Sequence, residues 1–108
     1  MPFLGAYIDS KLVGFVMATG SQQPTLTAES MKHHEPAGRT MCIHSVCVDK
    51  KHRRTGIATA LVREYIRRLV VLGDYDSAVL IVHRELAPLY ENCGFRVVGK
   101  SAVVHGTA

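Results

Sequence analysis

A helical repeat of apolar residues follows a short glycine turn, and this order constrains the fold of the chain more than any other feature. The apolar positions recur at the spacing of one helix face, and they are Ala58, Leu61, Val62, Tyr65, Ile66, Leu69 and Val70. Gly73 ends the pattern, so we expect a helix that begins at Ile57 and stops at this glycine. The preceding run from Met41 to Val48 is rich in β-branched and small apolar residues, which predicts a buried strand.

Further apolar runs predict the rest of the fold. Ala78 to Val82 follows the helix as a buried strand, and a strand, a helix and a strand in this order predict a right-handed crossover with parallel strands. Other runs predict antiparallel strands, and they are Phe3 to Ile8, Leu12 to Thr19, Phe95 to Val98 and Ala102 to His105. We expect the first two of these to be largely buried. Leu86 to Asn92, with Pro88 in its first turn, predicts a short helix. The fold class is therefore α/β, with a mixed sheet and flanking helices.

The polar segment from Gly20 to Arg39 shows no period and predicts a long loop, in which residues 29–32 are the candidates for a helical turn. With 108 residues and 47% hydrophobic content, the chain is expected to form a single domain over residues 1–108. No window approaches the roughly 20 apolar residues of a membrane span, and the start has no secretory signal pattern. Three cysteines without framework spacing fit reduced thiols. We expect a cytoplasmic protein that binds no membrane.

Positive charge gathers immediately before the glycine turn. The net charge is +4, and the run from Lys50 to Arg54 leads directly into Gly56. Such a run is either a solvated loop or part of an anion site, because free N–H groups converge at a helix N-terminus and bind phosphate. No aromatic residues interleave with the run, so nucleic acid is not an expected partner.

Two motifs resemble those of a known enzyme superfamily. Arg53-x-x-Gly56-x-Ala58 is similar to the Q/R-x-x-G-x-G/A pyrophosphate loop of the GNAT superfamily of acyl-CoA-dependent N-acetyltransferases. Tyr90-x-x-x-Gly94-Phe95 resembles the Y-x-x-x-G-F signature of the same superfamily. Residues 29–48 and 102–106 are similar to its aralkylamine (serotonin) N-acetyltransferase branch. The resemblance implies a GNAT-like fold with an acetyl-CoA-binding core over about residues 41–106.

The resemblance also implies which residues bind acetyl-CoA. The basic loop and the backbone N–H groups after it would hold the pyrophosphate, and the end of the preceding strand would run along the pantetheine arm. The residues concerned are Val46, Cys47, Val48, Arg53, Arg54, Thr55, Gly56, Ile57, Ala58 and Thr59. The sequence contains neither G-x-x-x-x-G-K-[ST] nor G-x-G-x-x-G, so the phosphate motifs of nucleoside triphosphatases and dinucleotide enzymes are absent.

Transfer to an amine needs a base and an acid. A primary amine of pKa about 10.4 is almost wholly protonated near neutral pH, and imidazole titrates in the range that suits its deprotonation. By the resemblance, His44 matches one of the two relay histidines of the aralkylamine branch, while Cys42 occupies the position of the other. Tyr90 matches the acid that protonates the leaving thiolate, an uphill transfer of about 2 kcal/mol from a phenol of pKa about 10 to a thiol of about 8.5. The alternatives are a hydrogen-bonded core histidine and a half-buried aromatic residue. His83 stands where many members have an asparagine that contacts CoA, and either contacts CoA differently or only ends the strand.

Cys42, His44 and Cys47 are residue types that bind zinc, so a metal site is an alternative interpretation. In a strand with unbroken alternation, Cys47 points away from the other two, so the three converge only if the strand is bulged. We therefore expect no metal. Cys93 lies three residues after Tyr90, but no base is identifiable beside it to make it a nucleophile.

The expected function is transfer of an acetyl group from acetyl-CoA to a small primary amine, an arylalkylamine or a polyamine, by direct attack in a ternary complex. The alternatives are a catalytically weak CoA-binding or assembly module and a protein or peptide N-acetyltransferase. Superfamily members usually carry a strand and two helices before the hairpin, and Phe3 already begins their second strand. The resemblance thus implies an N-terminally shortened fold with an incomplete acceptor half. Its first strand would be an exposed edge, which favours a homodimer.

Overall fold

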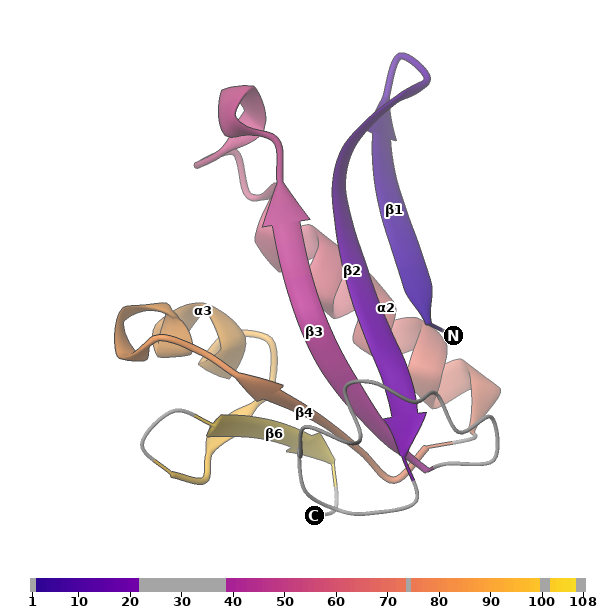
Figure 1. Cartoon of the computed structure of the whole chain (residues 1–108), viewed down its shortest axis with the longest axis vertical. Coiled ribbons are helices and arrows are strands. Elements are labelled where there is room, and N and C mark those ends of the chain that lie inside the picture. The colour runs from indigo at the N-terminus through magenta and orange to yellow at the C-terminus, as the bar shows by residue number, and fades with distance from the viewer. Residues whose placement is uncertain (1, 22–38, 74, 100–101, 107–108) are drawn as a thin grey trace.

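The computed structural model describes residues 2–21, 39–73, 75–99 and 102–106 (Figure 1). The strands are β1 (Phe3–Ile8), β2 (Lys11–Ser21), β3 (Thr40–Val48), β4 (Ser77–Ile81), β5 (Arg96–Val97) and β6 (Ala102–Gly106). The α-helices are α2 (Ile57–Leu72) and α3 (Ala87–Glu91), and the 3-10 helices are η1 (Lys50–His52) and η2 (Arg84–Leu86). The helical turn considered at residues 29–32 lies outside the described residues. Within them, no helix is long and apolar enough to cross a membrane.

The strands form one mixed sheet in the order β1-β2-β3-β4-β6-β5. β1, β2 and β3 are antiparallel neighbours, β3 and β4 are parallel, and β6 is antiparallel to both β4 and β5. The predicted crossover from β3 through α2 to β4 is therefore confirmed. So is the mixed sheet with flanking helices. The strand predicted over Phe95–Val98 is shorter than expected, because only Arg96 and Val97 pair with β6.

α2 has the predicted bounds. Gly73 takes the left-handed conformation at φ 70° and donates its N–H to the Leu69 carbonyl at 3.0 Å, which ends the helix. Five members of the predicted apolar stripe are buried, and they are Leu61, Val62, Tyr65, Ile66 and Leu69. The prediction for Val70 is wrong: Val70 is 59% exposed, and the two residues after it, Val71 and Leu72, are also exposed at the end of α2.

The main core lies between the sheet and the two α-helices, which both pack on one side of it. The opposite side, called the open face below, carries Phe3, Phe15, Met17, Cys47 and a small buried cluster of Cys42, Val79 and Val104.

The expectation that β1 is largely buried is wrong. Only Leu4 is buried in this strand, while Phe3, Tyr7 and Ile8 are 45%, 61% and 44% exposed. β1 is the first strand of the sheet, so β2 covers one side only, and no described helix covers its open face. The continuous apolar run that predicts a buried strand therefore lies partly in solvent.

His105 on β6 makes the stability of the fold pH-dependent. Its ring stacks edge-to-face on Phe95 and bonds to the Tyr75 hydroxyl at 3.3 Å. Burial, and then the nearby Arg96, hold its pKa below the ordinary 6.5. The unfolded chain thus binds this proton more readily, and the free energy of unfolding falls as pH drops below 6.5. We expect His105→Asn to flatten this fall between about pH 6.5 and pH 5, measured by urea unfolding midpoints.

The exposed carboxylate of Glu64 provides an internal comparison for this measurement. Arg67 and Arg68 lower the Glu64 pKa from 4.5 to about 2, so its stabilisation is present above pH 4.5 and is lost only as pH falls below that value. Glu64→Gln should leave the slope between about pH 6.5 and pH 5 unchanged. A His105→Asn variant with the wild-type slope in that window would contradict the assignment.

Candidate functional site

β3 and β4 diverge halfway along β3. The two strands pair from Thr40 opposite Ser77 to Ile43 opposite Leu80, and beyond this point β3 continues to Val48 with β2 on one side but without β4 on the other (Figure 1). From residue 44 onward, no described strand therefore lies beside this second edge of β3. Its backbone groups are available to a ligand at this point, which we call the strand opening.

Two of the three residues expected beside a ligand turn their backbone into the strand opening. The Asp49 N–H donates to the Val13 carbonyl on β2 at 2.7 Å. Because alternate residues of a strand point their backbone groups the same way, Cys47 also faces β2, while Val46 and Val48 face the strand opening. The expectation for Cys47 is thus only partly met: its backbone belongs to the ladder, and its exposed thiol lies on the open face.

His44 occupies a β-bulge. Met17 is opposite Ser45 and the next residue, Ala18, is opposite Ile43, so no residue of β2 lies directly opposite His44 in the ladder. Ile43 and Val46 both pack toward the main core, which places the two residues between them on the open face. The bulge therefore turns the His44 imidazole out of the sheet beside the strand opening.

Thr19 on β2 holds this imidazole. The Thr19 Oγ1 lies 2.9 Å from the His44 Nε2, and both residues are partly buried. The imidazole is thus fixed at one nitrogen, and the other nitrogen is the one that can exchange a proton with a substrate. His44 is a hydrogen-bonded histidine, as one alternative proposed, but it lies on the rim of the core and not inside it.

The basic loop after β3 folds back onto the strand. The Arg53 Nε donates to the Val48 carbonyl at 3.4 Å, and the Thr55 hydroxyl donates to the His52 carbonyl. Arg54 and Gly56 adopt positive φ angles of 62° and 83°. These two residues in the left-handed conformation, with Thr55 between them, turn the chain sharply into α2.

The N-terminus of α2 faces a cavity. The first helical bond runs from the Ala60 N–H to the Gly56 carbonyl, so the N–H groups of Ile57, Ala58 and Thr59 have no acceptor within the helix, and no side chain caps this end. The cavity has a volume of about 300 Å³ and is lined by Val48, His52, Arg53, Arg54, Gly56, Ile57, Ala58, Thr59 and Leu89. The structure therefore brings the predicted loop residues and the end of β3 to one basic, donor-rich site. Thr55 is exposed and is absent from this lining.

Tyr90 lies on α3, buried against Phe95 with ring centroids 5.7 Å apart. Burial raises the pKa of its phenol, and negative charge on the thiols of Cys93 and Cys47 raises it further. The hydroxyl stays protonated at neutral pH, and its proton transfer to a thiolate costs more than the value of about 2 kcal/mol expected for an unperturbed phenol.

Polar contacts fix α3 against the first turns of α2. The Arg63 guanidinium donates to the Asn92 carbonyl at 3.1 Å, and the buried Cys93 thiol lies 3.9 Å from the Thr59 carbonyl. Burial raises the Cys93 pKa, so this thiol is not an activated nucleophile. These contacts hold Tyr90 at a set position relative to the cavity.

β3 is bulged, so the side-chain alternation expected for an unbroken strand does not hold, and the expectation that Cys47 points away from Cys42 and His44 is wrong. Cys42 and Cys47 lie on the same face as His44. Even so, the described residues contain no group of three or more His, Cys, Asp or Glu side chains placed to hold a metal ion. Cys42 is fully buried with Val79 and Val104, where its thiol packs as a small apolar group.

Three residues of this site are not among those predicted from the sequence. Thr19 bonds to His44, while Leu89 and His52 line the cavity. Thr19 is the polar residue that ends the continuous apolar run of residues 12–18, which is a weak signal. Its role becomes visible only once the pairing of β2 with β3 is known.

Comparisons with known proteins agree on one family. The family model described as Acetyltransferase (GNAT) family matches residues 1–95. Serotonin N-acetyltransferase of Mesocricetus auratus is 34% identical over 104 residues, which are 96% of this chain and 50% of that protein. N-alpha-acetyltransferase 30 of Homo sapiens is 42% identical over 65 residues, 57% of this chain and 18% of that protein. The chain spans about half the length of the serotonin N-acetyltransferases it matches.

Solved structures show the same fold. The loading GNATL domain of CurA from Lyngbya majuscula superposes with a TM-score of 0.83 at 9% identity, over 97% of this chain and 76% of that chain. A GNAT family N-acetyltransferase from Escherichia coli, solved in complex with CoA, has a TM-score of 0.67 at 22% identity, over 98% of this chain and 58% of that chain.

Proposed function

Because this chain belongs to the acetyltransferase (GNAT) family, we propose that it transfers an acetyl group from acetyl-CoA to a small primary amine by direct attack in a ternary complex. One observation carries the proposal. The free backbone edge of β3 begins beside the hydrogen-bonded His44 on its bulge and ends at Val48, which lines the cavity at the N-terminus of α2. A long, partly anionic thioester and an amine acceptor need these three features at one place.

The residues at the strand opening fit the CoA moiety. A pyrophosphate group needs several N–H donors and positive charge, and the cavity supplies the N–H groups of Ile57, Ala58 and Thr59 with Arg53 and Arg54 beside them. The cavity floor at Gly56 carries no side chain, and an added Cβ there would meet nothing within 4 Å. The pantetheine arm would run along Val46 and Val48, which supply backbone donors and acceptors. When bound, acetyl-CoA supplies an activated thioester.

The proposed proton transfers follow from the placement of two side chains. His44 accepts a proton from the nitrogen of the acceptor amine, and Thr19 fixes the ring for this role. The Val46 or Val48 N–H is placed to stabilise negative charge on the carbonyl oxygen, usually the largest catalytic contribution in acyl transfer. Tyr90 then donates its hydroxyl proton to the departing sulfur.

Aromatic and aliphatic side chains on the open face support an arylalkylamine as the acceptor. Phe15 and Met17 are neighbours of Cys47 and Ser45 across the β2–β3 ladder, and Phe3 stacks on Phe15 with centroids 6.0 Å apart. They form an apolar surface on the His44 side of the sheet. A flat aromatic acceptor can rest on such a surface, whereas a polyamine gains little from it.

A peptide N-terminal amine is a second candidate acceptor. The 42% identity over 65 residues to N-alpha-acetyltransferase 30 favours it. No described helix covers the open face at β2 and β3, so an extended chain has access to it from that side. The two candidate acceptors differ in the group attached to the amine, which is an aromatic ring in an arylalkylamine and a peptide backbone in a protein N-terminus.

Thiol release from acetyl-CoA, measured across arylalkylamines, polyamines and peptides with free N-termini, tests the proposal. We expect the largest stimulation with arylalkylamines. Stronger stimulation by peptides would move the assignment to the second candidate. Absence of stimulation by any amine, together with retained CoA binding, would contradict catalysis and favour a CoA-binding or assembly module.

Removal of the Tyr90 hydroxyl tests whether this side chain donates the proton to the departing CoA sulfur. Tyr90→Phe is expected to lower kcat by about tenfold to a hundredfold with little change in CoA affinity, because the aromatic packing against Phe95 is kept. Steady-state kinetics and calorimetric CoA titration measure the two effects. Tyr65→Phe is the matched control, since that tyrosine is fully buried in the core. An unchanged kcat in Tyr90→Phe removes the residue from the mechanism.

A further inference from the structure

The outer side of β1 has the character of a pairing surface. No described strand pairs with this side. Natural edge strands usually carry charge, proline or a bulge that blocks association, yet Phe3–Ile8 contains neither a charged residue nor a proline. The β1–β2 ladder has a bulge between Ala6 and Tyr7, but its extra residue, Val13, belongs to β2, so β1 itself keeps its alternation. Phe3, Tyr7 and Ile8 are also among the exposed large apolar residues.

Backbone geometry fixes which residues of β1 can pair outward. The Ala18 N–H donates to the Pro2 carbonyl at 2.9 Å, so Pro2 faces β2. Alternate residues of an antiparallel strand point their N–H and C=O groups to the same side. Phe3, Gly5 and Tyr7 therefore present their backbone donors and acceptors to the free edge.

We propose that a second copy of this chain pairs with this edge, β1 against β1, antiparallel across a two-fold axis at Gly5. This register joins the largest number of outward groups, because Gly5 is the middle one of the three. It sets Phe3 of one copy opposite Tyr7 of the other, twice, on the open face. An added Cβ on Gly5 would lie 3.0 Å from the Tyr7 ring and 3.2 Å from the Phe3 ring, so both rings already lean over the axis. Four aromatic rings would thus cluster above paired glycines.

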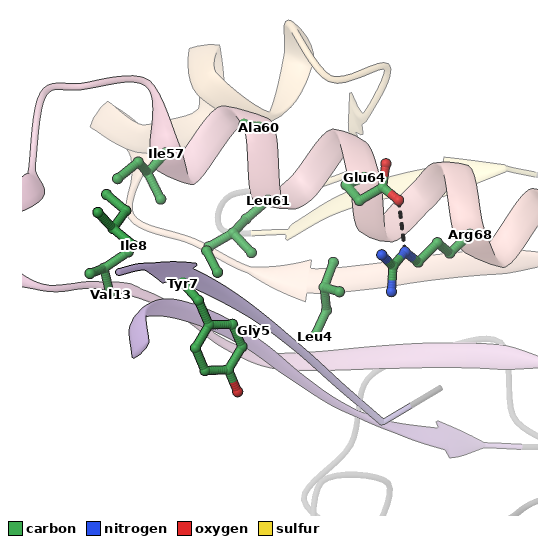
Figure 2. Close-up of a pocket in the computed structure, with 11 residues that line it drawn as sticks. Leu4, Gly5, Tyr7, Ile8, Val13, Ile57, Ala60, Leu61, Glu64 and Arg68 are labelled. Atoms are coloured by element: carbon green, nitrogen blue, oxygen red, sulfur yellow. Dashed lines mark hydrogen bonds and ion pairs between the residues drawn. The ribbon is translucent and has the colours of Figure 1, made fainter. Parts of the chain in front are cut away.

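The helix side of β1 fits the same arrangement. A groove of about 280 Å³ lies between β1 and α2 (Figure 2). Leu4 and Leu61 point into the groove, while the Tyr7 ring points away from α2. In the proposed register Leu4 lies opposite Ala6 of the second copy, so the two grooves adjoin across the axis and their aliphatic walls are covered together. α2 packs over β1, β2 and β3, which leaves the outer edge of β1 clear.

Charge and area indicate a weak dimer. Two copies of net charge +4 repel each other, and the uncharged β1 edge brings no like charges into direct contact. At about 200 Å² for a fully exposed aromatic side chain, the exposed parts of Phe3 and Tyr7 amount to about 210 Å² per copy. With Ile8, Leu12 and the backbone, both copies together approach the roughly 1,000 Å² at which specific interfaces begin. The dimer should therefore be weak and depend on protein concentration.

Sedimentation velocity from micromolar to near-millimolar protein tests the association. We expect a reversible monomer–dimer equilibrium, weakened at least about tenfold by Tyr7→Lys, which puts like charges at both ends of the pairing. Val97→Lys is the matched control, because Val97 is 52% exposed on β5, the opposite edge strand. It should leave the equilibrium unchanged. A wild-type chain that stays monomeric throughout, or a dimer broken by Val97→Lys and not by Tyr7→Lys, overturns the proposal.

Disulfide trapping tests the register. In a Cys47→Ser background, which removes the exposed thiol, the double variant Phe3→Cys with Tyr7→Cys should form a covalent dimer under mild oxidation. Directly opposed residues lie about 5.5 Å apart between Cα atoms, within the range that a disulfide spans. Each single variant places its thiols far apart across the axis and should trap much less. Equal trapping by a single variant overturns the two-fold axis at Gly5.

Discussion

Replacement of Gly56 by valine is expected to raise the dissociation constant for CoA by about tenfold to a hundredfold. Gly56 has a φ of 83°, a conformation that costs other residues about 1–2 kcal/mol and costs a β-branched residue more. Each factor of ten in affinity corresponds to about 1.4 kcal/mol. Relief of this strain moves the turn and so displaces the N–H groups of Ile57 and Ala58 that the proposal assigns to the pyrophosphate. Calorimetric titration with CoA measures the loss.

Valine substitutions at two other glycines distinguish a loss of CoA binding from a general loss of stability. Gly73 has a φ of 70° and, like Gly56, nothing within 4 Å of an added Cβ, but it lies at the other end of α2. Gly73→Val should lower the melting temperature and leave CoA affinity unchanged. Gly99 also has nothing within 4 Å of an added Cβ, but its φ is not positive. Gly99→Val should therefore change neither the melting temperature nor the CoA affinity. If Gly56→Val binds CoA with wild-type affinity, the assignment of this loop as the pyrophosphate site is wrong.

Local signals account for the parts of the fold and site that the sequence predicts. The stripe of α2, its stop at Gly73 and the turn at Gly56 depend on residues close together in the chain, and all lie where expected. The loop residues converge on one cavity for the same reason, since they are consecutive and open a helix.

Pairing between distant segments accounts for the rest. The bulge at His44 arises because β2 offers one residue fewer than β3 over this stretch, and nothing in the sequence around His44 marks it. The contact of His44 with Thr19 joins residues 25 apart in sequence. Likewise, β1 is exposed because it lies at the edge of the sheet. Its apolar sequence does not indicate whether the strand is central or at the edge.

Replacement of His44 by glutamine is expected to lower kcat at neutral pH by about 10²- to 10³-fold, with CoA affinity unchanged. The amide keeps a hydrogen-bonding group near Thr19 but cannot accept a proton from an amine nitrogen. An amine of pKa about 10.4 then depends on its neutral fraction in solution, which is about one in a thousand near pH 7.4. That fraction rises about tenfold for each pH unit, so the deficit should shrink as pH increases.

The pKa of the acceptor provides a second, independent measure of the same role. For primary amines of decreasing pKa, the ratio of wild-type to His44→Gln kcat/KM should fall toward one, because less proton removal is required of the enzyme. Thr19→Val, which removes the 2.9 Å contact and keeps the imidazole, should show a smaller deficit with the same dependence on amine pKa, and Thr19→Ser should restore the wild-type rate. A deficit that is equal for all amines and at every pH would mean that His44 supports the bulge and does not accept the proton.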